Sequence, residues 1–245
     1  MNNREIFDNH WKNFISKDLS SQKKEVAKVF LKPIIDKINN SEKILRVLDF
    51  GCGNGVHAEV LHELVNTDFK YTGIDISKQA IDLCKSKYFD RNKFKFFCLD
   101  ILSEEINDNY DIIFSYGCIA YTKKPTVILS KLREKLKNNG ILVSWIYTPN
   151  IFFIISLISL RLICKSFGNR FTNFIANTLV YFLKYLPVSS GVNLSNSSFD
   201  QCKETVMINI SPKSLLLPTR KTALKWFLKS NFKLKYSSKS YNIFV

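Results

Sequence analysis

Apolar residues in the first 150 positions occur in two patterns that alternate along the chain. Short, mostly apolar runs of six or seven residues are typical of buried strands. Between them, apolar residues recur every three or four positions, which predicts helices. The expected strands are 44–49, 71–76, 94–99, 111–116 and 141–147, and the expected helices are 22–38 (with Pro33 inside), 56–65, 80–84 and 128–136. This alternation indicates βαβ units and a parallel sheet covered on both faces.

The C-terminal part of the chain departs from this alternation. Residues 151–186 are strongly apolar and helical in character, and residues 187–196 read as a loop. A last helix at 222–228 precedes two short strands, 232–236 and 241–245, which the Ser237–Ser240 turn joins as an antiparallel hairpin. We expect one domain over residues 1–245, divided into an N-terminal helical segment 1–40, a ligand-binding core 41–150, a helical insertion 151–200 and a C-terminal helix with hairpin 201–245.

A glycine-rich motif follows the first expected strand. The run Val47-Leu-Asp-Phe-Gly-Cys-Gly-Asn-Gly55 lies where a parallel strand turns into a helix, the usual ligand position in open α/β sheets. Glycines there permit a tight turn and bring backbone N–H groups close to a ligand. Nicotinamide and flavin enzymes and plain tight turns share such motifs, so the motif alone does not choose among them.

Acidic residues follow the next two strands. Asp75 lies 26 residues after Asp49, where a carboxylate can accept hydrogen bonds from both ribose hydroxyls of a nucleoside. Asp100 follows the third strand, where a carboxylate can accept from an adenine amine. Each also suits a helix N-cap, with Ser77 as an alternative cap beside Asp75.

Five ordered motifs together resemble the class I S-adenosylmethionine-dependent methyltransferases, within their small-molecule branch (types 11 and 12). They are VLDFGCGNG, YTGIDIS, FCLDIL, YDIIFSYGCIAY and LREKLKNNGILVSWIY, over about residues 45–147, with a looser likeness in SPKSLLLPTRKTALKWFLKSNFKLKY. The dinucleotide pattern GxGxxG fails here because Val56 stands at its third glycine. The resemblance implies a Rossmann-like, mostly parallel seven-stranded sheet with a C-terminal antiparallel strand and a helical cap inserted after strand five.

The resemblance also implies roles toward S-adenosylmethionine and its product S-adenosylhomocysteine. Asp49 would orient the methionine amino group, while Gly51 and Gly53, with Cys52 between them, would lie against the methionine and ribose portion. The remaining implied cofactor-binding residues are Asp75 for the ribose hydroxyls, Ile76 packed on the adenine, Asp100 for the adenine amine, Ile101 through its backbone N–H, and Ser115 and Tyr116 facing the sulfonium and the acceptor.

The catalytic residues remain open, with Tyr116 and Tyr121 as candidates. Many relatives carry a His-His pair after the fourth strand, but here Ala120 and Tyr121 stand in its place. The chain has three histidines, of which His57 and His62 fall in the helix after the glycine motif and are interpreted as surface or packing residues. Methyl transfer from a sulfonium can proceed without a strong base, since positioning supplies much of the rate.

Charge is distributed unevenly along the chain. The net charge is +15, of which residues 1–134 contribute +2 and residues 135–245 contribute +13. An anionic partner would therefore meet the C-terminal half, unless its dispersed lysines only cover solvent faces. An RNA methyltransferase is a rival interpretation, but the sequence Phe-Ser-Tyr-Gly at the end of strand four is unlike the N/D-P-P-Y type associated with nucleobase amines, so nucleic acid is less favoured. A second rival is a protein that binds S-adenosylmethionine without turnover.

Three interpretations stay open for the apolar stretch 151–186. It is a lid or core element, a helix pair at an anionic membrane surface, or a membrane span. It carries Arg161, Lys165, Arg170 and Lys184 and no acidic residue, and Arg161 interrupts its longest apolar run. The acceptor is accordingly expected to be a small molecule, a glycan or a lipid-like compound, with possible peripheral contact with an anionic membrane.

Cysteine use and the N-terminus bear on the compartment. The six cysteines form no CxxC pair and no regular spacing, which argues against a metal site or a disulfide framework and for free thiols in a reducing cytoplasm. The first 14 residues contain no apolar region of the signal-peptide kind. We expect a cytoplasmic protein, free or peripheral to the membrane, and the sequence does not indicate its oligomeric state.

Overall fold

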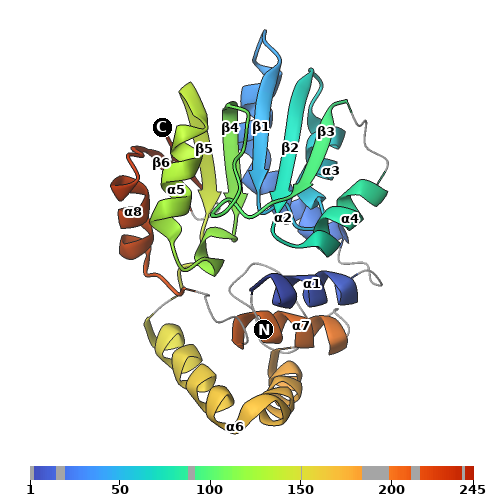
Figure 1. The fold of residues 1–245 in the computed structure, drawn as a ribbon, viewed down its shortest axis with the longest axis vertical. Coiled ribbons are helices and arrows are strands. Elements are labelled where there is room, and N and C mark those ends of the chain that lie inside the picture. Colours follow the sequence, from blue (N-terminus) through green and yellow to red (C-terminus); the bar gives the residue numbers. More distant parts are fainter. Residues whose placement is uncertain are drawn as a thin grey trace.

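A single seven-stranded sheet forms the centre of the molecule (Figure 1). The computed structural model describes residues 3–14, 20–87, 92–149, 151–183, 199–210, 216–238 and 241–245. The strand order is β3-β2-β1-β4-β5-β7-β6, and β7 alone runs antiparallel to its neighbours β5 and β6. The strands are β1 (Leu45–Phe50), β2 (Phe69–Asp75), β3 (Phe94–Cys98), β4 (Tyr110–Tyr116), β5 (Leu136–Trp145), β6 (Leu234–Ser237) and β7 (Asn242–Phe244). This confirms the expected mostly parallel sheet with its antiparallel C-terminal strand.

Helices cover both faces of the sheet, so successive strand residues enter two different cores. In β1, Val47 faces a core that includes Phe30 of α2, while Leu48 faces a core that includes Phe227 of α8. Burial on both faces explains why the central strands are continuously apolar rather than alternating. The elements around the sheet are α2 (Ser20–Asn39), α3 (Val56–Leu64), α4 (Lys78–Ser86), the short 3-10 helix η1 (Ile119–Tyr121), α5 (Pro125–Glu134) and α8 (Arg220–Lys229).

The start of the fifth strand differs from the sequence prediction for an identifiable reason. The fifth strand was expected from residue 141, but β5 begins at Leu136, which pairs with Tyr110 before the ladder resumes between Ile112 and Ile141. The Asn-Asn-Gly turn therefore forms an irregularity inside the strand instead of separating a helix from it. Helix α2 runs without interruption through Pro33.

Three further helices form a cap beyond the carboxyl ends of the parallel strands. Helix α1 (Asn3–Phe14) and helix α7 (Phe199–Ile210) lie between the sheet and the outermost helix α6 (Ile151–Leu183) (Figure 1). Helix α1 lies within the segment 1–40 that was expected to be helical, although only 22–38 was expected there as a defined helix, and α7 was not predicted as a separate element. The expected helical character of 151–186 is confirmed over 151–183, and the expected loop 187–196 lies outside the described residues.

Helix α6 is two helical arms that meet at Gly168. The backbone there has φ 79° and ψ −173°, which breaks the helix, and Figure 1 shows the resulting hairpin. One side of the hairpin packs on α7 through a small apolar core made of Leu157, Cys164, Ala176, Val180, Cys202, Val206 and Ile210. In the described part of the chain, no helix has the length and apolar character needed to cross a membrane.

We expect Gly168→Ala to destabilise this cap. A side chain at φ 79°, ψ −173° is strained by about 1–3 kcal/mol, although an added Cβ would meet no atom within 4 Å. Urea unfolding and amide hydrogen exchange across α6 should therefore show faster opening in the variant. Ser159→Ala, at an exposed helical position of the first arm, should change neither by more than about 0.5 kcal/mol. Equal stability of the two variants would contradict this account of the bend.

Candidate functional site

The glycine turn after β1 adopts a conformation that side chains would prevent. Gly51 and Gly53 have φ of 82° and 52°, in the left-handed region that favours glycine. A Cβ on Gly51 would lie 2.6 Å from the side chain of Cys118, and one on Gly53 would lie 2.7 Å from the ring of Trp11. The N–H groups of Gly51 and Cys52 both donate to the carbonyl of Ile74, at 2.8 and 3.0 Å, so the turn is fixed to the end of β2.

Asp75, the last residue of β2, bridges the glycine turn and the start of α4. Its Oδ2 accepts from the Gly53 N–H and its Oδ1 from the Ser77 N–H, both at 2.9 Å. The N-cap of α4 is Ser77, whose hydroxyl accepts from the Ala80 N–H at 3.2 Å. Capping is thus performed by Ser77, and each Asp75 oxygen retains capacity for a further donor. Burial raises the pKa of Asp75 to about 6, although the two backbone hydrogen bonds oppose that rise.

Asp49 presents a buried carboxylate oxygen that nothing in the described residues satisfies. Its side chain is fully buried, and its Oδ2 accepts the Tyr71 hydroxyl at 2.6 Å and lies 3.4 Å from Nδ1 of His57. Its Oδ1 has no hydrogen-bond partner among the described residues. Burial, with the nearby Asp49 charge, raises the pKa of Tyr71 well above its ordinary value, so Tyr71 remains a donor. An unsatisfied buried carboxylate oxygen suits a cationic ligand group such as an ammonium.

Strand β4 ends in two residues with different surroundings. The Ser115 hydroxyl is buried 3.0 Å from Sγ of Cys118, whose thiol donates to the Phe50 carbonyl at 2.9 Å. Burial raises the pKa of Cys118 far above its ordinary value, so the thiol stays protonated. Ser115 therefore supports the glycine turn through Cys118, and a contact with the sulfonium or the acceptor stays a prediction.

The two tyrosines named as catalytic candidates are both partly buried and protonated. Tyr116 stacks on Trp145 with ring centroids 4.7 Å apart, and burial raises its pKa. Tyr121 meets the ring of Phe7 edge-on at 5.2 Å, and burial raises its pKa to about 12 against the opposing charge of Arg161 from α6. At neutral pH neither phenol is an effective general base. Their catalytic roles remain untested.

The residues expected near the adenine follow β2 and β3. Ile76 is half-buried, and its carbonyl accepts a weak hydrogen bond from the Cys98 thiol at 3.5 Å. Oδ1 of Asp100 accepts from the Leu102 N–H at 3.0 Å, so this side chain stabilises the local turn. Ile101 is buried, and its carbonyl accepts from Lys131 at 2.6 Å. The roles of Ile76, Asp100 and Ile101 toward adenine remain predictions.

Helix α1 covers the glycine turn, which the sequence analysis missed. Asp8 accepts from the Ser77 hydroxyl at 2.6 Å and from the Gln79 N–H at 3.3 Å, at the start of α4. Trp11 lies against Gly53, and Phe7 lies against Tyr121. The signal was present in the sequence, because apolar residues recur at helical spacing in this segment.

A second missed residue is His57, whose ring is buried beside Asp49. It also lies 5.6 Å from the Tyr116 ring, between centroids, and packs near Phe30 and Phe114. The interpretation of His57 as a packing residue agrees with this environment, but sequence spacing did not indicate its contact with Asp49. The described residues contain no group of three or more His, Cys, Asp or Glu side chains arranged to hold a metal ion.

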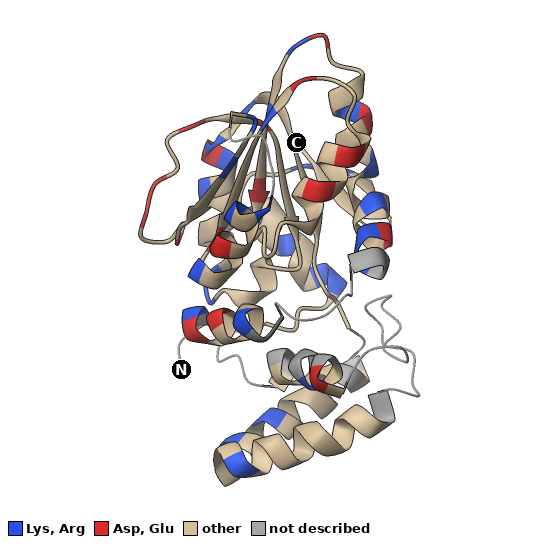
Figure 2. Cartoon of the chain, turned by 90° about the vertical axis from the view of Figure 1, so that its right-hand side faces the viewer, with Lys and Arg blue, Asp and Glu red and all other residues tan. Residues whose placement is uncertain are grey.

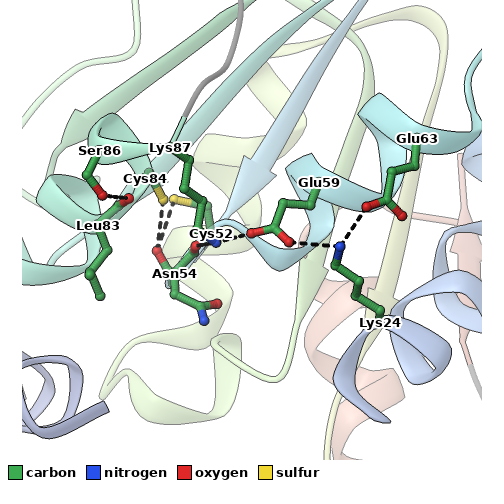
Figure 3. A network of polar contacts seen from close by, with 10 residues as sticks. Lys24, Cys52, Asn54, Glu59, Glu63, Leu83, Cys84, Ser86 and Lys87 are labelled. Atoms are coloured by element: carbon green, nitrogen blue, oxygen red, sulfur yellow. Dashed lines mark hydrogen bonds and ion pairs between the residues drawn. The ribbon is translucent and has the colours of Figure 1, made fainter. Parts of the chain in front are cut away.

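A chain of ion pairs contacts the glycine turn at the carbonyl of Asn54 (Figure 3). Lys87, after α4, donates to the Asn54 carbonyl and pairs with Glu59 of α3. Glu59 also pairs with Lys24 of α2 at 3.2 Å, and Lys24 pairs with Glu63 at 2.6 Å. These side chains are partly exposed, so each pair contributes little to stability, but together they fix the carbonyl side of the turn.

Comparison with known proteins identifies the class. Residues 41–151 match the model of a methyltransferase-domain family. A malonyl-[acyl-carrier protein] O-methyltransferase of Acetivibrio thermocellus is 29% identical over 119 residues, covering 48% of this chain and 41% of that protein. The 5-methylorsellinic acid synthase of Aspergillus terreus is 29% identical over 131 residues, covering 51% of this chain and 5% of the synthase. The chain thus matches less than half the length of these relatives.

Solved structures agree on the fold. The plantazolicin methyltransferase BpumL, solved with a pentazolic desmethylPZN analogue and SAH, superposes with a TM-score of 0.53 at 15% identity, over 96% of this chain and 80% of that one. The cyclopropane synthase MmaA2 of Mycobacterium tuberculosis gives 0.53 at 13% identity, over 86% and 60% of the two chains. The [4+2]-cyclase SpnF gives 0.52 at 16% identity, over 84% and 58%.

Residues 41–151 are therefore a methyltransferase domain of the class I S-adenosylmethionine-dependent superfamily. This confirms the class that the five sequence motifs resembled, together with its Rossmann-like fold. The match begins before β1 and ends at the start of α6, so it contains the glycine turn and the strand-end acids but excludes most of the cap.

Proposed function

We propose that this protein transfers a methyl group from S-adenosylmethionine to a small-molecule, glycan or lipid-like acceptor. The observation that carries the proposal is the pairing of two carboxylates around the glycine turn. Asp75 is bound to the Gly53 N–H with capacity for more donors, and Asp49 has a buried oxygen with no partner in the described residues. A nucleoside that carries an amino acid needs one hydrogen-bond acceptor for its ribose hydroxyls and another for its ammonium group at such a turn.

Each of these residues would contact a particular part of S-adenosylmethionine. Asp49 would accept from the methionine ammonium, Gly51 and Gly53 would leave room for the backbone to approach, and Asp75 would accept from the ribose hydroxyls. Ile76, Asp100 and Ile101 follow the adjacent strands and would meet the adenine. Cys52 is buried, and its pKa is raised by burial, so it serves packing of the turn and not nucleophilic chemistry.

The chemistry requires positioning more than proton removal. When bound, the cofactor supplies a methyl group on an activated sulfonium, and correct placement of the acceptor accounts for up to about 7–11 kcal/mol of the barrier. Tyr116 and Tyr121 keep their protons at neutral pH, so they would bind or orient an acceptor as hydrogen-bond donors. This favours an amine, thiol or enolate acceptor over an aliphatic hydroxyl, which needs a base.

The acceptor class draws support from the names of the relatives and from charge. The curated relatives include O-methyltransferases of malonyl-[acyl-carrier protein] and polyketide synthases, whose substrates are small or carrier-bound. The +13 charge of residues 135–245 keeps an RNA acceptor as the alternative. Steep loss of RNA binding with salt, absent for small acceptors, would distinguish it.

A second candidate function is binding of the cofactor for another purpose. The likeness to a [4+2]-cyclase indicates that this fold by itself does not determine the reaction.

For the compartment we propose the cytoplasm, supported by six cysteines that are all free of disulfides.

A screen with labelled S-adenosylmethionine over lipid, glycan, quinone-like and RNA fractions tests methyl transfer against cofactor binding for another purpose. Label transfer to no fraction, with intact cofactor binding, would favour the non-methylating function.

Cofactor binding is the first expectation to test. Calorimetry should show S-adenosylmethionine and S-adenosylhomocysteine binding at micromolar affinity, about −8 kcal/mol. NAD is the control ligand, because Val56 replaces the third glycine of the dinucleotide pattern. Tight NAD binding without S-adenosylmethionine binding would refute the proposal.

Replacing Asp75 with Ala should weaken cofactor affinity selectively. The ribose hydroxyls would lose their acceptor, at a cost of roughly 1.5–3 kcal/mol, or about 10- to 150-fold in Kd. Asp82→Ala, an exposed acid on α4, is the matched control and should bind as the wild type does. Unchanged affinity in Asp75→Ala, with an intact circular dichroism spectrum, would assign Asp75 to holding the turn alone.

Cofactor affinity should also fall as the pH falls from 7 to 5. The pKa of Asp75 is about 6, so the side chain gains a proton as the pH falls through this range. Only the deprotonated carboxylate can accept hydrogen bonds from both ribose hydroxyls, and protonation therefore removes an acceptor. At pH 5 the Kd for S-adenosylhomocysteine should be about tenfold higher than at pH 7. Asp75→Asn should bind more weakly and lose this pH dependence. An equal pH dependence in wild type and Asp75→Asn would place the titration elsewhere.

A further inference from the structure

Exposed apolar side chains are concentrated on one element. Of the eighteen large hydrophobic residues exposed in the described parts of the chain, eight belong to α6. Their exposure runs from 45% for Ile163 to 79% for Phe152. The eight are Phe152, Ile155, Ile158, Leu162, Ile163, Phe167, Phe174 and Tyr181. A soluble surface rarely gathers so many large apolar groups without a partner.

Tyr181 meets the ring of Phe199 in α7 edge-on, with centroids 5.6 Å apart. The other seven residues form the outer face of the hairpin, outside the core that it shares with α7. On the first arm the buried positions Leu157 and Cys164 enter the core shared with α7, whereas Ile155, Ile158 and Leu162 follow one another at helical spacing on the open side. Packing on α7 therefore accounts for the inner face alone. A lid or core role, one of the three interpretations that the sequence left open, leaves this outer face unexplained.

Charge on α6 is of one sign. The helix contains no acidic residue, and its exposed cations, Lys165 and Arg170, flank the bend at Gly168 beside the exposed Phe167. Figure 2 shows α6 with blue segments and no red ones. Arg161, which the sequence placed with these cations, is half-buried and interacts with Tyr121 instead. The outer face is thus apolar with a cationic tip.

We propose that the outer face of α6 docks on anionic lipid bilayers. Apolar side chains would enter the boundary between headgroups and acyl chains, while Lys165 and Arg170 meet anionic headgroups. The arms, residues 151–167 and 169–183, are each roughly 25 Å long, which suits a hairpin lying in the plane of the interface. Docking of this kind does not depend on the proposed methyl transfer.

Lipid fits this face better than a second copy of the chain. A symmetric contact through the same face would bring the Lys165 and Arg170 side chains of two copies to one apolar interface without an acid on α6 to pair them. A bilayer with anionic headgroups supplies many counter-charges at the required depth. Arg161 of the same hairpin interacts with Tyr121, one of the catalytic candidates, so the proposed docking surface and a candidate residue of the site belong to adjoining elements.

Vesicle co-sedimentation of the full chain tests the docking. The wild type should pellet with phosphatidylglycerol-containing vesicles at low salt, more weakly with pure phosphatidylcholine, and less as salt rises from about 50 to 300 mM. Lys165→Gln with Arg170→Gln should weaken binding to the anionic vesicles roughly 30-fold. Phe167→Ser with Phe174→Ser should weaken binding to both vesicle types.

Matched controls make the result decisive. Lys229→Gln with Lys233→Gln removes the same charge at exposed sites near the C-terminus and should bind as the wild type does. Circular dichroism and S-adenosylhomocysteine affinity should be equal in all variants, so failed folding or a failed cofactor site is visible separately. Absence of pelleting at low salt, or equal loss in both charge variants, would overturn the proposal. Sedimentation showing a dimer that Phe167→Ser with Phe174→Ser abolishes, without vesicle binding, would assign the face to a second copy.

Discussion

The hydrogen bond from the Gly53 N–H to the carboxylate of Asp75 is the interaction on which the site depends. It joins the turn after β1 to the end of β2, and the second oxygen of the same carboxylate holds the start of α4 through Ser77. Two βα connections, 22 residues apart in sequence, therefore share one charged group. The raised pKa of Asp75 reflects the burial that this arrangement imposes.

The two carboxylates of the site, Asp49 and Asp75, differ in their hydrogen-bond partners. Asp49 is fully buried, and Tyr71 and His57 surround one of its oxygens while the other faces no partner in the described residues. Asp75 is bonded at both oxygens to backbone donors. Burying a carboxylate without a full set of hydrogen-bond donors destabilises the fold. We therefore interpret Asp49 as a binding group for a cationic ligand.

The sequence predicted the sheet and the strand-end acids because their signals are local. Apolar runs such as 44–49 and the glycine motif define strands and turns without knowledge of distant residues. The start of β5 at Leu136 was missed, since it depends on pairing with Tyr110 across a bulge. The contacts of Asp8 with Ser77 and of His57 with Asp49 were missed because they join distant segments or depend on side-chain direction, which spacing does not encode.

The position of α1 has a kinetic consequence. Trp11 lies on Gly53, and Asp8 ties the same helix to the start of α4, so the turn is covered by a segment that precedes the domain in sequence. A ligand that approaches Gly53 from the side of α1 would have to displace the indole. Departure on that side would then require the undocking of a twelve-residue helix, so residence time at the turn would depend on the few polar and aromatic contacts of α1 as well as on the ligand's own contacts.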